Sequence, residues 1–231
     1  MIRKPSFRNI NWGDSDEVIL RKIEKIRAKG TSIDLRDEYG RTILFDAIAN
    51  ERENIVSAIL AMGASVDIED NFGFSPLMYA VACKKESIYQ NIVLKTKDVK
   101  AKEEALFFAI EHRCDEERIE DLIASRGVDV NARDINDATP LIRVVSAGNV
   151  ENDWNKSLIK FLIKHNANPT LADRDGLTAL GAAYGKLVLD KEVEHILTEA
   201  SQRFVKSKQT VAKKTFKDLL QHIFFGRDSR C

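Results

Sequence analysis

The chain repeats itself at an interval of 33 residues, and this self-similarity limits the possible folds more than any other feature of the sequence. The segment "GRTILFDAIAN" at 40–50 is followed at 73–83 by "GFSPLMYAVAC". The recurring positions are Asp37, Gly40, Thr42, Leu44 and Ala47, with their counterparts Asp70, Gly73, Ser75, Leu77 and Ala80. A period of this length predicts a stack of similar units, each packed against its neighbours.

Further openings of the same kind occur later at less regular intervals. They are Asp134, Thr139, Pro140 and Leu141, and then Asp173, Gly176, Thr178, Leu180 and Ala183. The segment "EEALFFAI" at 103–110 keeps the Ala-Leu-Phe spacing but lacks the D-x-x-G turn, so it predicts a degenerate unit with a shortened loop. The unit that begins at 134 carries an insertion, "AGNVENDWNK".

Each unit has the pattern of two helices separated by turns. Thr or Ser before the first apolar run can cap a helix N-terminus, and Pro76 and Pro140 suit the first helical turn, where the missing N–H costs little. Gly63, Gly127 and Asn166 stand where the second helix of a unit would end in the left-handed region.

This pattern resembles ankyrin repeats, which share the 33-residue period and the T-P-L-H-x-A signature, over residues 30–200. The resemblance implies an all-α ankyrin-repeat solenoid of about five helix–turn–helix units with N- and C-terminal capping helices. The predicted organisation is an N-terminal capping repeat at 1–36, repeats at 37–69, 70–102, 103–133 (degenerate), 134–172 and 173–200, and a basic C-terminal helical cap at 201–231. The first-helix leucines should be buried, namely Leu44, Leu77, Leu141 and Leu180.

The sequence departs from the family pattern at the histidine that follows this leucine. The residues in its place are Phe45, Met78, Phe107, Ile142 and Gly181. We therefore expect apolar packing to replace the hydrogen bonds that this histidine makes between neighbouring loops.

Both ends of the repeat region are predicted to be helical. Residues 15–35 place apolar side chains at helical spacing before Gly30, as expected for the outer helix of a capping repeat. Residues 186–225 contain neither Gly nor Pro and predict two helices with a break near Ser207 to Thr210. The second of these is basic and amphipathic, and we expect it to close the stack. Contact of this helix with an anionic membrane is the alternative.

Composition sets limits on the partner and the compartment. Lys plus Arg and Asp plus Glu both total 36, so net charge gives no reason to expect nucleic acid or a strongly charged substrate. Three widely spaced cysteines suit a reducing compartment. The N-terminal segment lacks the apolar stretch of a secretory signal. We expect a cytoplasmic location, or delivery into a host cytosol without a classical signal peptide.

The sequence offers no support for catalysis. Phosphate-binding loops and nucleophile elbows of the known patterns are absent from it. His112 and Cys114 are close in sequence but lack the spacing of a metal site. We therefore predict a non-enzyme with no cofactor, no metal and no small-molecule substrate.

The resemblance implies binding of a protein partner through the concave surface of turn loops and first helices. The expected contact residues flank the turn glycine: Glu38, Tyr39, Arg41, Asn71, Phe72, Phe74, Ile135, Asn136, Arg174, Asp175 and Leu177. Alternatively, Tyr39, Phe72 and Phe74 pack between adjacent loops. The favoured interpretation is a non-catalytic interaction module, including a bacterial or viral protein that acts on a host partner. The alternatives are an immunity or inhibitor protein that blocks one enzyme or toxin, and an enzyme with an unrecognised site.

Overall fold

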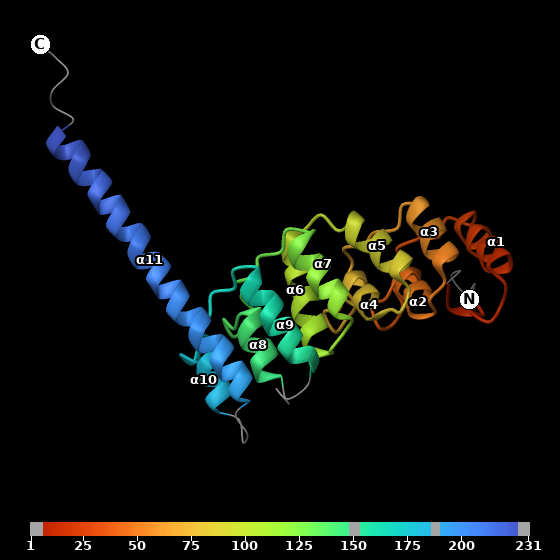
Figure 1. Ribbon diagram of the computed structural model, residues 1–231. Helices are drawn as coiled ribbons and strands as arrows, with labels where there is room; N and C mark the ends of the chain where they lie inside the picture. Colours follow the sequence, from red (N-terminus) through yellow and green to blue (C-terminus); the bar gives the residue numbers. More distant parts are fainter. Residues whose placement is uncertain (1–6, 148–152, 186–189, 226–231) are drawn as a thin grey trace, which may run out of the picture. The chain divides into compact units, whose positions relative to one another are not determined.

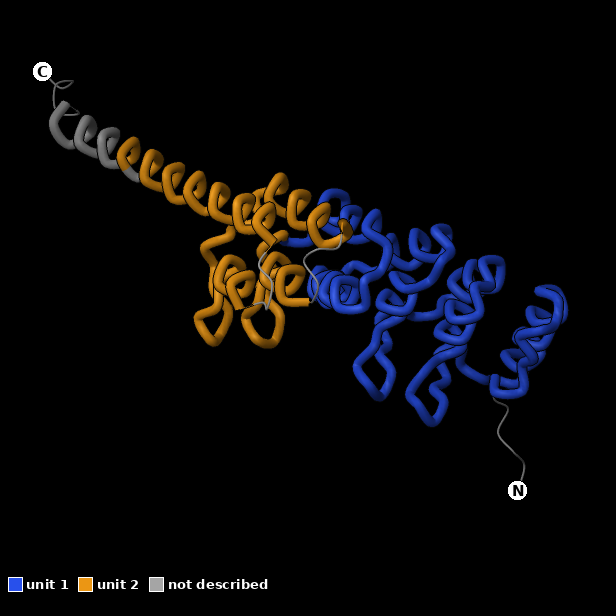
Figure 2. Tube along the Cα trace, turned by 60° about the horizontal axis from the view of Figure 1, so that its bottom comes forward, with its two compact units in different colours: residues 1–129 blue, residues 130–231 orange. Residues whose placement is uncertain are grey.

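A computed structural model describes residues 7–147, 153–185 and 190–225. The regular elements in these ranges are helices, apart from one isolated bridge between Ala172 and Thr178 (Figure 1). The predicted all-α class is therefore confirmed. The chain forms two compact units, unit 1 at 1–129 and unit 2 at 130–231, coloured blue and orange in Figure 2.

The helices of unit 1 lie in two rows. They are η1 (Phe7–Asn9), α1 (Asp16–Arg27), α2 (Ile43–Ala49), α3 (Glu53–Ala61), α4 (Pro76–Ala82), α5 (Glu86–Lys95), α6 (Val99–Glu111) and α7 (Glu116–Ala124). Helix α4 contacts α2 and α6 in a first row, and α3 contacts α1 and α5 in a second row. Each first-row helix also packs on the helix that follows it in the chain, so unit 1 is a stack of helix pairs.

The expected capping residues begin most of the first helices of the repeats, including α8 (Pro140–Ser146) and α10 (Ala179–Tyr184) of unit 2. The hydroxyls of Ser75, Thr139 and Thr178 accept hydrogen bonds at 3.1–3.3 Å from the backbone N–H three residues further on. Thr42 precedes α2 in the same extended conformation but makes no such bond. Capping by a side-chain hydrogen bond is therefore confirmed at three of the four positions.

The second helices end as the sequence predicts. Gly63, Gly127 and Asn166 all have positive φ angles, of 90°, 72° and 68°. This left-handed conformation follows the last turn of α3, α7 and α9 (Asp153–Lys164), and it turns the chain out of the helix.

Apolar residues of both helices in each repeat form the core, and the predicted leucines belong to the first helix. Leu44, Leu77 and Leu141 are buried as predicted. The prediction is wrong for Leu180, which is half-buried. Its helix, α10, packs on α8 within unit 2, and among the described residues no first helix of a further repeat follows it.

Apolar packing replaces the signature histidine at three positions. Phe45 is fully buried and meets the ring of Tyr79 edge to face, with centroids 5.0 Å apart. Met78 and Ile142 are also buried. Phe107 is half-buried, and Gly181 has no side chain to contribute.

In the degenerate unit, additional helical residues take the place of the loop that precedes the first helix in the other repeats. Helix α6 begins at Val99, seven residues before Leu106, whereas α4 begins one residue before Leu77. It therefore has 13 residues, against 7 in α2 and in α4. Its sequence, "VKAKEEAL", is free of Gly and Pro and rich in good helix formers. Asp98 caps this start by accepting a hydrogen bond of 3.0 Å from the backbone N–H of Lys100.

A buried arginine of α7 secures the end of α4. Arg118 donates hydrogen bonds through Nη1 to the carbonyl oxygens of Ala80 (3.1 Å), Val81 (2.7 Å) and Cys83. These groups lie in the last turn and C-cap of α4, where helical carbonyls lack partners within the helix.

A carboxylate network joins α5 to α7. Asp121 accepts hydrogen bonds from the Tyr89 hydroxyl (2.8 Å) and from Nε of Arg126 (2.9 Å). Burial raises the pKa of Asp121, but the hydrogen bonds from Arg126 and Tyr89 and the charge of Arg126 outweigh it, so the pKa lies below its ordinary value. Burial and the same hydrogen bond raise the pKa of Tyr89.

This network predicts a pH-dependent contribution to stability. Because the folded pKa of Asp121 is lowered, its contribution is present above the unfolded value of about 3.9 and is lost as the pH falls through the folded value. Asp121→Asn should lower the free energy of unfolding by about 1–3 kcal/mol at pH 7. In urea titrations the difference from wild type should shrink at pH 3. Glu111→Gln, at an exposed residue of α6, is the control. A difference between Asp121→Asn and wild type that is equal at pH 7 and pH 3 would contradict the prediction.

Unit 2 contains α8 (Pro140–Ser146), α9 (Asp153–Lys164), α10 (Ala179–Tyr184) and α11 (Lys191–Phe225). Helix α8 packs on α9 and α10, and α11 packs on both α9 and α10. Residues 148–152 of the predicted insertion lie outside the described residues.

The predicted break near residues 207–210 is wrong, because α11 is one helix of 35 residues. The hydroxyls of Ser207 and Thr210 donate to carbonyl oxygens of the same helix, of Phe204 (2.8 Å) and Lys206 (2.9 Å), and so do not interrupt it. Val193 and Leu197 near its start are fully buried, whereas Val211 is 64% exposed. The early turns therefore pack on unit 2, and Figure 1 shows the helix continuing past α10.

The apolar residues predicted for the terminal helix are Phe216, Leu219, Leu220 and Ile223, whose side chains lie outside the described part of the structure. Closure of the stack by this segment stays a prediction. In the ranges that the structure does describe, no helix has both the length and the apolar character needed to span a membrane.

The core predicts a large difference between two leucines of unit 1. Leu77 is fully buried in α4, and Leu94 on α5 is 66% exposed. Leu77→Ala should lower the free energy of unfolding by about 2–5 kcal/mol, because it leaves a cavity. Leu94→Ala should change it by no more than about 0.5 kcal/mol. Chemical denaturation of both variants measures the two values, and similar losses would contradict the packing described here.

Candidate functional site

Four five-residue loops, here called fingers, carry the predicted contact residues. Fingers 1 and 2 (37–41 and 70–74) belong to unit 1, and fingers 3 and 4 (134–138 and 173–177) to unit 2. In Figure 2, two loops project from the helices of each unit.

The aspartate at the start of each finger builds the loop. In all four fingers its Oδ1 accepts hydrogen bonds of 2.8–3.0 Å from the backbone N–H groups two and four residues later. Its own N–H donates to the carbonyl of the fifth residue at 2.8–3.1 Å. The repeated Asp is thus the residue that closes the finger by satisfying its backbone donors.

The fourth residue of each finger turns the chain back. Gly40, Gly73 and Gly176 have φ angles of 78°, 82° and 78°. Asp137 takes this place in finger 3 with a φ of 58°, a conformation that Asp tolerates better than most residues.

In unit 1, fingers 1 and 2 are joined by hydrogen bonds. The backbone N–H of Asn71 donates to the Tyr39 carbonyl (2.8 Å), and Nδ2 of Asn71 donates to the Glu38 carbonyl (3.0 Å). Arg36 donates through Nε to the Gly40 carbonyl (2.8 Å) and through Nη2 to the Glu69 carbonyl (2.9 Å). The two fingers are therefore held side by side.

Fingers 3 and 4 of unit 2 are joined in the same way. The Arg174 backbone N–H donates to the Asn136 carbonyl (2.9 Å). Nη1 of Arg133 donates to the Asp137 carbonyl and to the Ala172 carbonyl (2.6 Å). Arg36 and Arg133 were missed by the sequence reasoning. The signal that could have found them is an arginine directly before the finger aspartate.

Among the described residues, neither Tyr39 nor Phe72 contacts another aromatic ring. Tyr39 is 49% exposed and Phe72 is 71% exposed. Phe74 is 36% exposed and meets Phe108 of α6, with centroids 5.6 Å apart. Phe74 therefore packs against a helix, and packing of the three rings between adjacent loops stays an alternative prediction. In unit 2, Ile135 is 84% exposed, and Leu177 is also exposed.

The polar residues predicted as contacts have different roles. The Asn71 and Arg174 side chains donate to the preceding finger, so they position it. Glu38 is exposed and paired with Arg8, and Asn136 is exposed. Asp175 is exposed and donates its backbone N–H to Asp173.

Arg41 organises the charges at the base of finger 1. Its guanidinium lies 3.1 Å from Asp37, 3.9 Å from Asp46 and 5.1 Å from the centroid of the Tyr39 ring. Burial raises the pKa of Asp37, but hydrogen bonds from the Arg41 and Tyr39 backbone and from the Arg41 side chain bring it below its ordinary value. Burial raises the pKa of Asp46 despite the charge of Arg41.

His112 contacts an aromatic ring, and the Cys83 and Cys114 side chains are buried and half-buried. The His112 ring stacks on Phe108, with centroids 4.2 Å apart. Burial raises the pKa of the Cys83 and Cys114 thiols, opposite to the shift that makes a cysteine reactive. Across the described residues, no group of three or more His, Cys, Asp or Glu side chains could hold a metal ion.

The joined fingers predict different responses at two glycines with the same backbone conformation. A Cβ on Gly40 would meet the backbone nitrogen of Asn71 at 2.8 Å, whereas a Cβ on Gly73 would have nothing within 4 Å. Both Ala variants carry the left-handed strain of about 1–2 kcal/mol. Gly40→Ala should lose a further 1–3 kcal/mol or so from overpacking. Equal losses in free energy of unfolding would contradict the close approach of Asn71 to Gly40.

Comparison with known proteins gives consistent matches. The family model described as "Ankyrin repeats (3 copies)" matches residues 17–103, and that described as "Ankyrin repeats (many copies)" matches residues 106–151. The crystal structure of an ankyrin repeat domain from Acinetobacter baumannii is 30% identical, with a TM-score of 0.67, covering 80% of this chain and 93% of that chain.

Two solved structures of lower identity share the fold. The ankyrin repeat domain of Bcl-3, a member of the IkappaB family, is 21% identical with a TM-score of 0.64, covering 81% of this chain and 86% of that one. A chain from the structure of a predatory endopeptidase of Bdellovibrio bacteriovorus in complex with an immunity protein is 21% identical with a TM-score of 0.62, covering 78% and 92%. The sequence has no match among curated proteins.

Proposed function

The chain belongs to the ankyrin-repeat family, and on that premise we propose that it is a non-catalytic module that binds a partner protein through its fingers and the first-row helix faces beside them. Ankyrin repeats are in general protein–protein interaction modules, and repeat stacks present extended surfaces to their partners.

The observation that carries the proposal is the combination of rigid fingers with exposed apolar tips. Tyr39 and Phe72 sit on loops whose backbones are fixed by Asp37 and Asp70 and joined through Asn71. A loop that is ordered before binding loses little conformational entropy in the complex. Aromatic side chains beside polar ones have the composition of an interface centre with a polar rim.

The proposed surface extends from finger 2 onto a first-row helix of unit 1. Phe74 contacts Phe108, and Phe108 stacks on His112, which is exposed on the last turn of α6. This row of rings leads from the loop to the helix. A partner that contacts Phe72 would therefore find further aromatic surface along α6.

Unit 2 offers a smaller surface of the same kind. Ile135 on finger 3 is exposed, and Leu177 ends finger 4. Arg133 and the backbone of Arg174 hold these two fingers together. We assign this pair a supporting role because it lacks aromatic side chains.

Inhibition of one enzyme or toxin is a narrower form of the same function. In its favour, a solved structure with this fold includes a predatory endopeptidase in complex with an immunity protein. A tight one-to-one complex that abolishes the partner's activity would support inhibition, and a partner that stays active in the complex would support a scaffold.

The proposal predicts that finger rings act on affinity and not on stability. A partner isolated by affinity capture with the wild-type chain would be purified and titrated calorimetrically against Tyr39→Ala, Phe72→Ala and the double variant. The double variant should lose more than roughly 2 kcal/mol of binding free energy with an almost unchanged melting temperature.

Leu94→Ala is the matched control, since it removes a similarly exposed apolar side chain from α5. It should bind the partner normally. Lower melting temperatures with full affinity for the Tyr39 and Phe72 variants would mean that the rings only stabilise the fingers, and the binding surface would have to lie elsewhere.

A further inference from the structure

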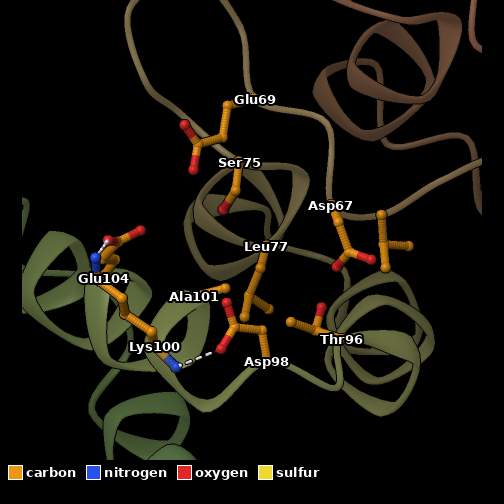
Figure 3. A pocket seen from close by; sticks show the side chains of 10 residues that line it. Asp67, Glu69, Ser75, Leu77, Thr96, Asp98, Lys100, Ala101 and Glu104 are labelled. Carbon is orange, nitrogen blue, oxygen red and sulfur yellow. Dashed lines mark hydrogen bonds and ion pairs between the residues drawn. The ribbon is translucent and has the colours of Figure 1, made fainter.

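A hollow of about 430 Å³ opens beside finger 2, within unit 1 (Figure 3). Buried residues form its floor, namely Val66, Ser75, Leu77 and Thr96, together with the half-buried Ala101. Charged residues surround this floor, namely Asp67, Glu69, Asp98, Lys100 and Glu104. The hollow thus combines an apolar base with an ionised rim.

The hollow lies where a further finger would otherwise pack. The chain that would form that finger is helical instead, as the first turns of α6 from Val99 onward. The surroundings of two finger glycines show this difference. A Cβ on Gly40 would meet Asn71 of the next finger, whereas a Cβ on Gly73 would have nothing within 4 Å. The flank of finger 2 is therefore uncovered.

The rim carries an excess of negative charge. Four carboxylates face one ammonium group, that of Lys100, whose Nζ is 3.9 Å from Glu104. Within the described residues, Asp67, Glu69 and Asp98 form no ion pair. Burial raises the pKa of the neighbouring Glu103, and the charges of Asp129, Asp98 and Glu104 raise it further. A cation would relieve this repulsion.

The residue before the finger aspartate differs at this finger. Arg36 and Arg133 occupy that position in fingers 1 and 3, where each bridges its own finger to the next one. Finger 2 has Glu69 there, and no finger follows it in unit 1. Fingers 1 and 2, and fingers 3 and 4, are each joined by an arginine at this position. At finger 2 the same position carries a carboxylate, which lies on the rim of the hollow.

We propose that the hollow receives an arginine side chain of the partner protein, an inference that depends on the proposed function. The methylene stem would lie against the half-buried Ala101, above the buried floor, and the guanidinium would face the carboxylates labelled in Figure 3. Arginine fits better than lysine because its planar fork donates to several carboxylates at once and is more weakly hydrated.

The test uses the full chain, labelled with ¹⁵N, and the capped tripeptide acetyl-Ala-Arg-Ala-amide. Saturable shifts of backbone amide signals should be grouped in residues 66–77 and 96–104. The peptide with citrulline, which keeps the shape and removes the charge, should bind roughly fivefold or more weakly, and so should the lysine peptide.

Matched charge variants locate the binding. Glu69→Gln with Glu104→Gln should weaken the arginine peptide roughly fivefold. Glu17→Gln with Glu24→Gln, at exposed positions of α1, changes the net charge equally and should leave the affinity unchanged. Amide shifts that are absent, or scattered over the chain, would overturn the proposal. So would a citrulline or lysine peptide that binds as tightly as the arginine peptide, or equal losses of affinity in the two double variants. The same amide shifts on addition of micromolar Ca²⁺ would also overturn it.

These measurements do not need the partner, so the two proposals fail separately. If the arginine peptide does not bind as predicted, the proposal of an arginine site fails and the proposal of a finger surface is unaffected. If the peptide binds as predicted but the Tyr39 and Phe72 variants keep full affinity for the partner, the proposal that the fingers bind the partner fails instead.

Discussion

The hydrogen bonds from two backbone N–H groups to one aspartate oxygen are the interaction on which the fingers depend. Without an acceptor inside the loop, these donors would have no partner in the protein. Once Asp37 or Asp134 fixes the loop, its carbonyls face the next finger, and Asn71 or Arg174 can donate to them. Local closure of one finger therefore creates the docking surface for its neighbour.

Local signals account for what could be predicted from the sequence. The 33-residue period, the capping hydroxyls and the glycines at helix ends act over a few residues, so the helix pairs and the finger positions were predictable. Arg36 and Arg133 stand directly before a finger aspartate, but the distant carbonyl oxygens that they bind, those of Glu69 and Ala172, lie more than 30 residues away, so local patterns did not predict their bridging role. The half-burial of Leu180 depends on the neighbours of α10, which no local pattern specifies. The continuous α11 shows that polar residues without Gly or Pro are a weak break signal.

The degenerate unit shows how a repeat can change its surface and keep its core. Leu106 and Ala109 are buried on α6, as the corresponding residues are on α2 and α4. The extra turns before them replace polar loop with helix, and Asp98 supplies a cap at the new start. The stack stays continuous as long as the first helix of each repeat keeps its buried apolar face, so the structure at the finger position can vary.

Arg118 couples the unfolding of two helices that belong to different pairs. Its guanidinium, held by α7, binds the last carbonyl oxygens of α4, so the C-terminal turn of α4 keeps these three hydrogen bonds only while α7 stays docked. The amides of that turn should then exchange with solvent at rates governed by the opening of α7, and not by fraying of α4 alone. We expect this one buried side chain to make α4 and α7 open together.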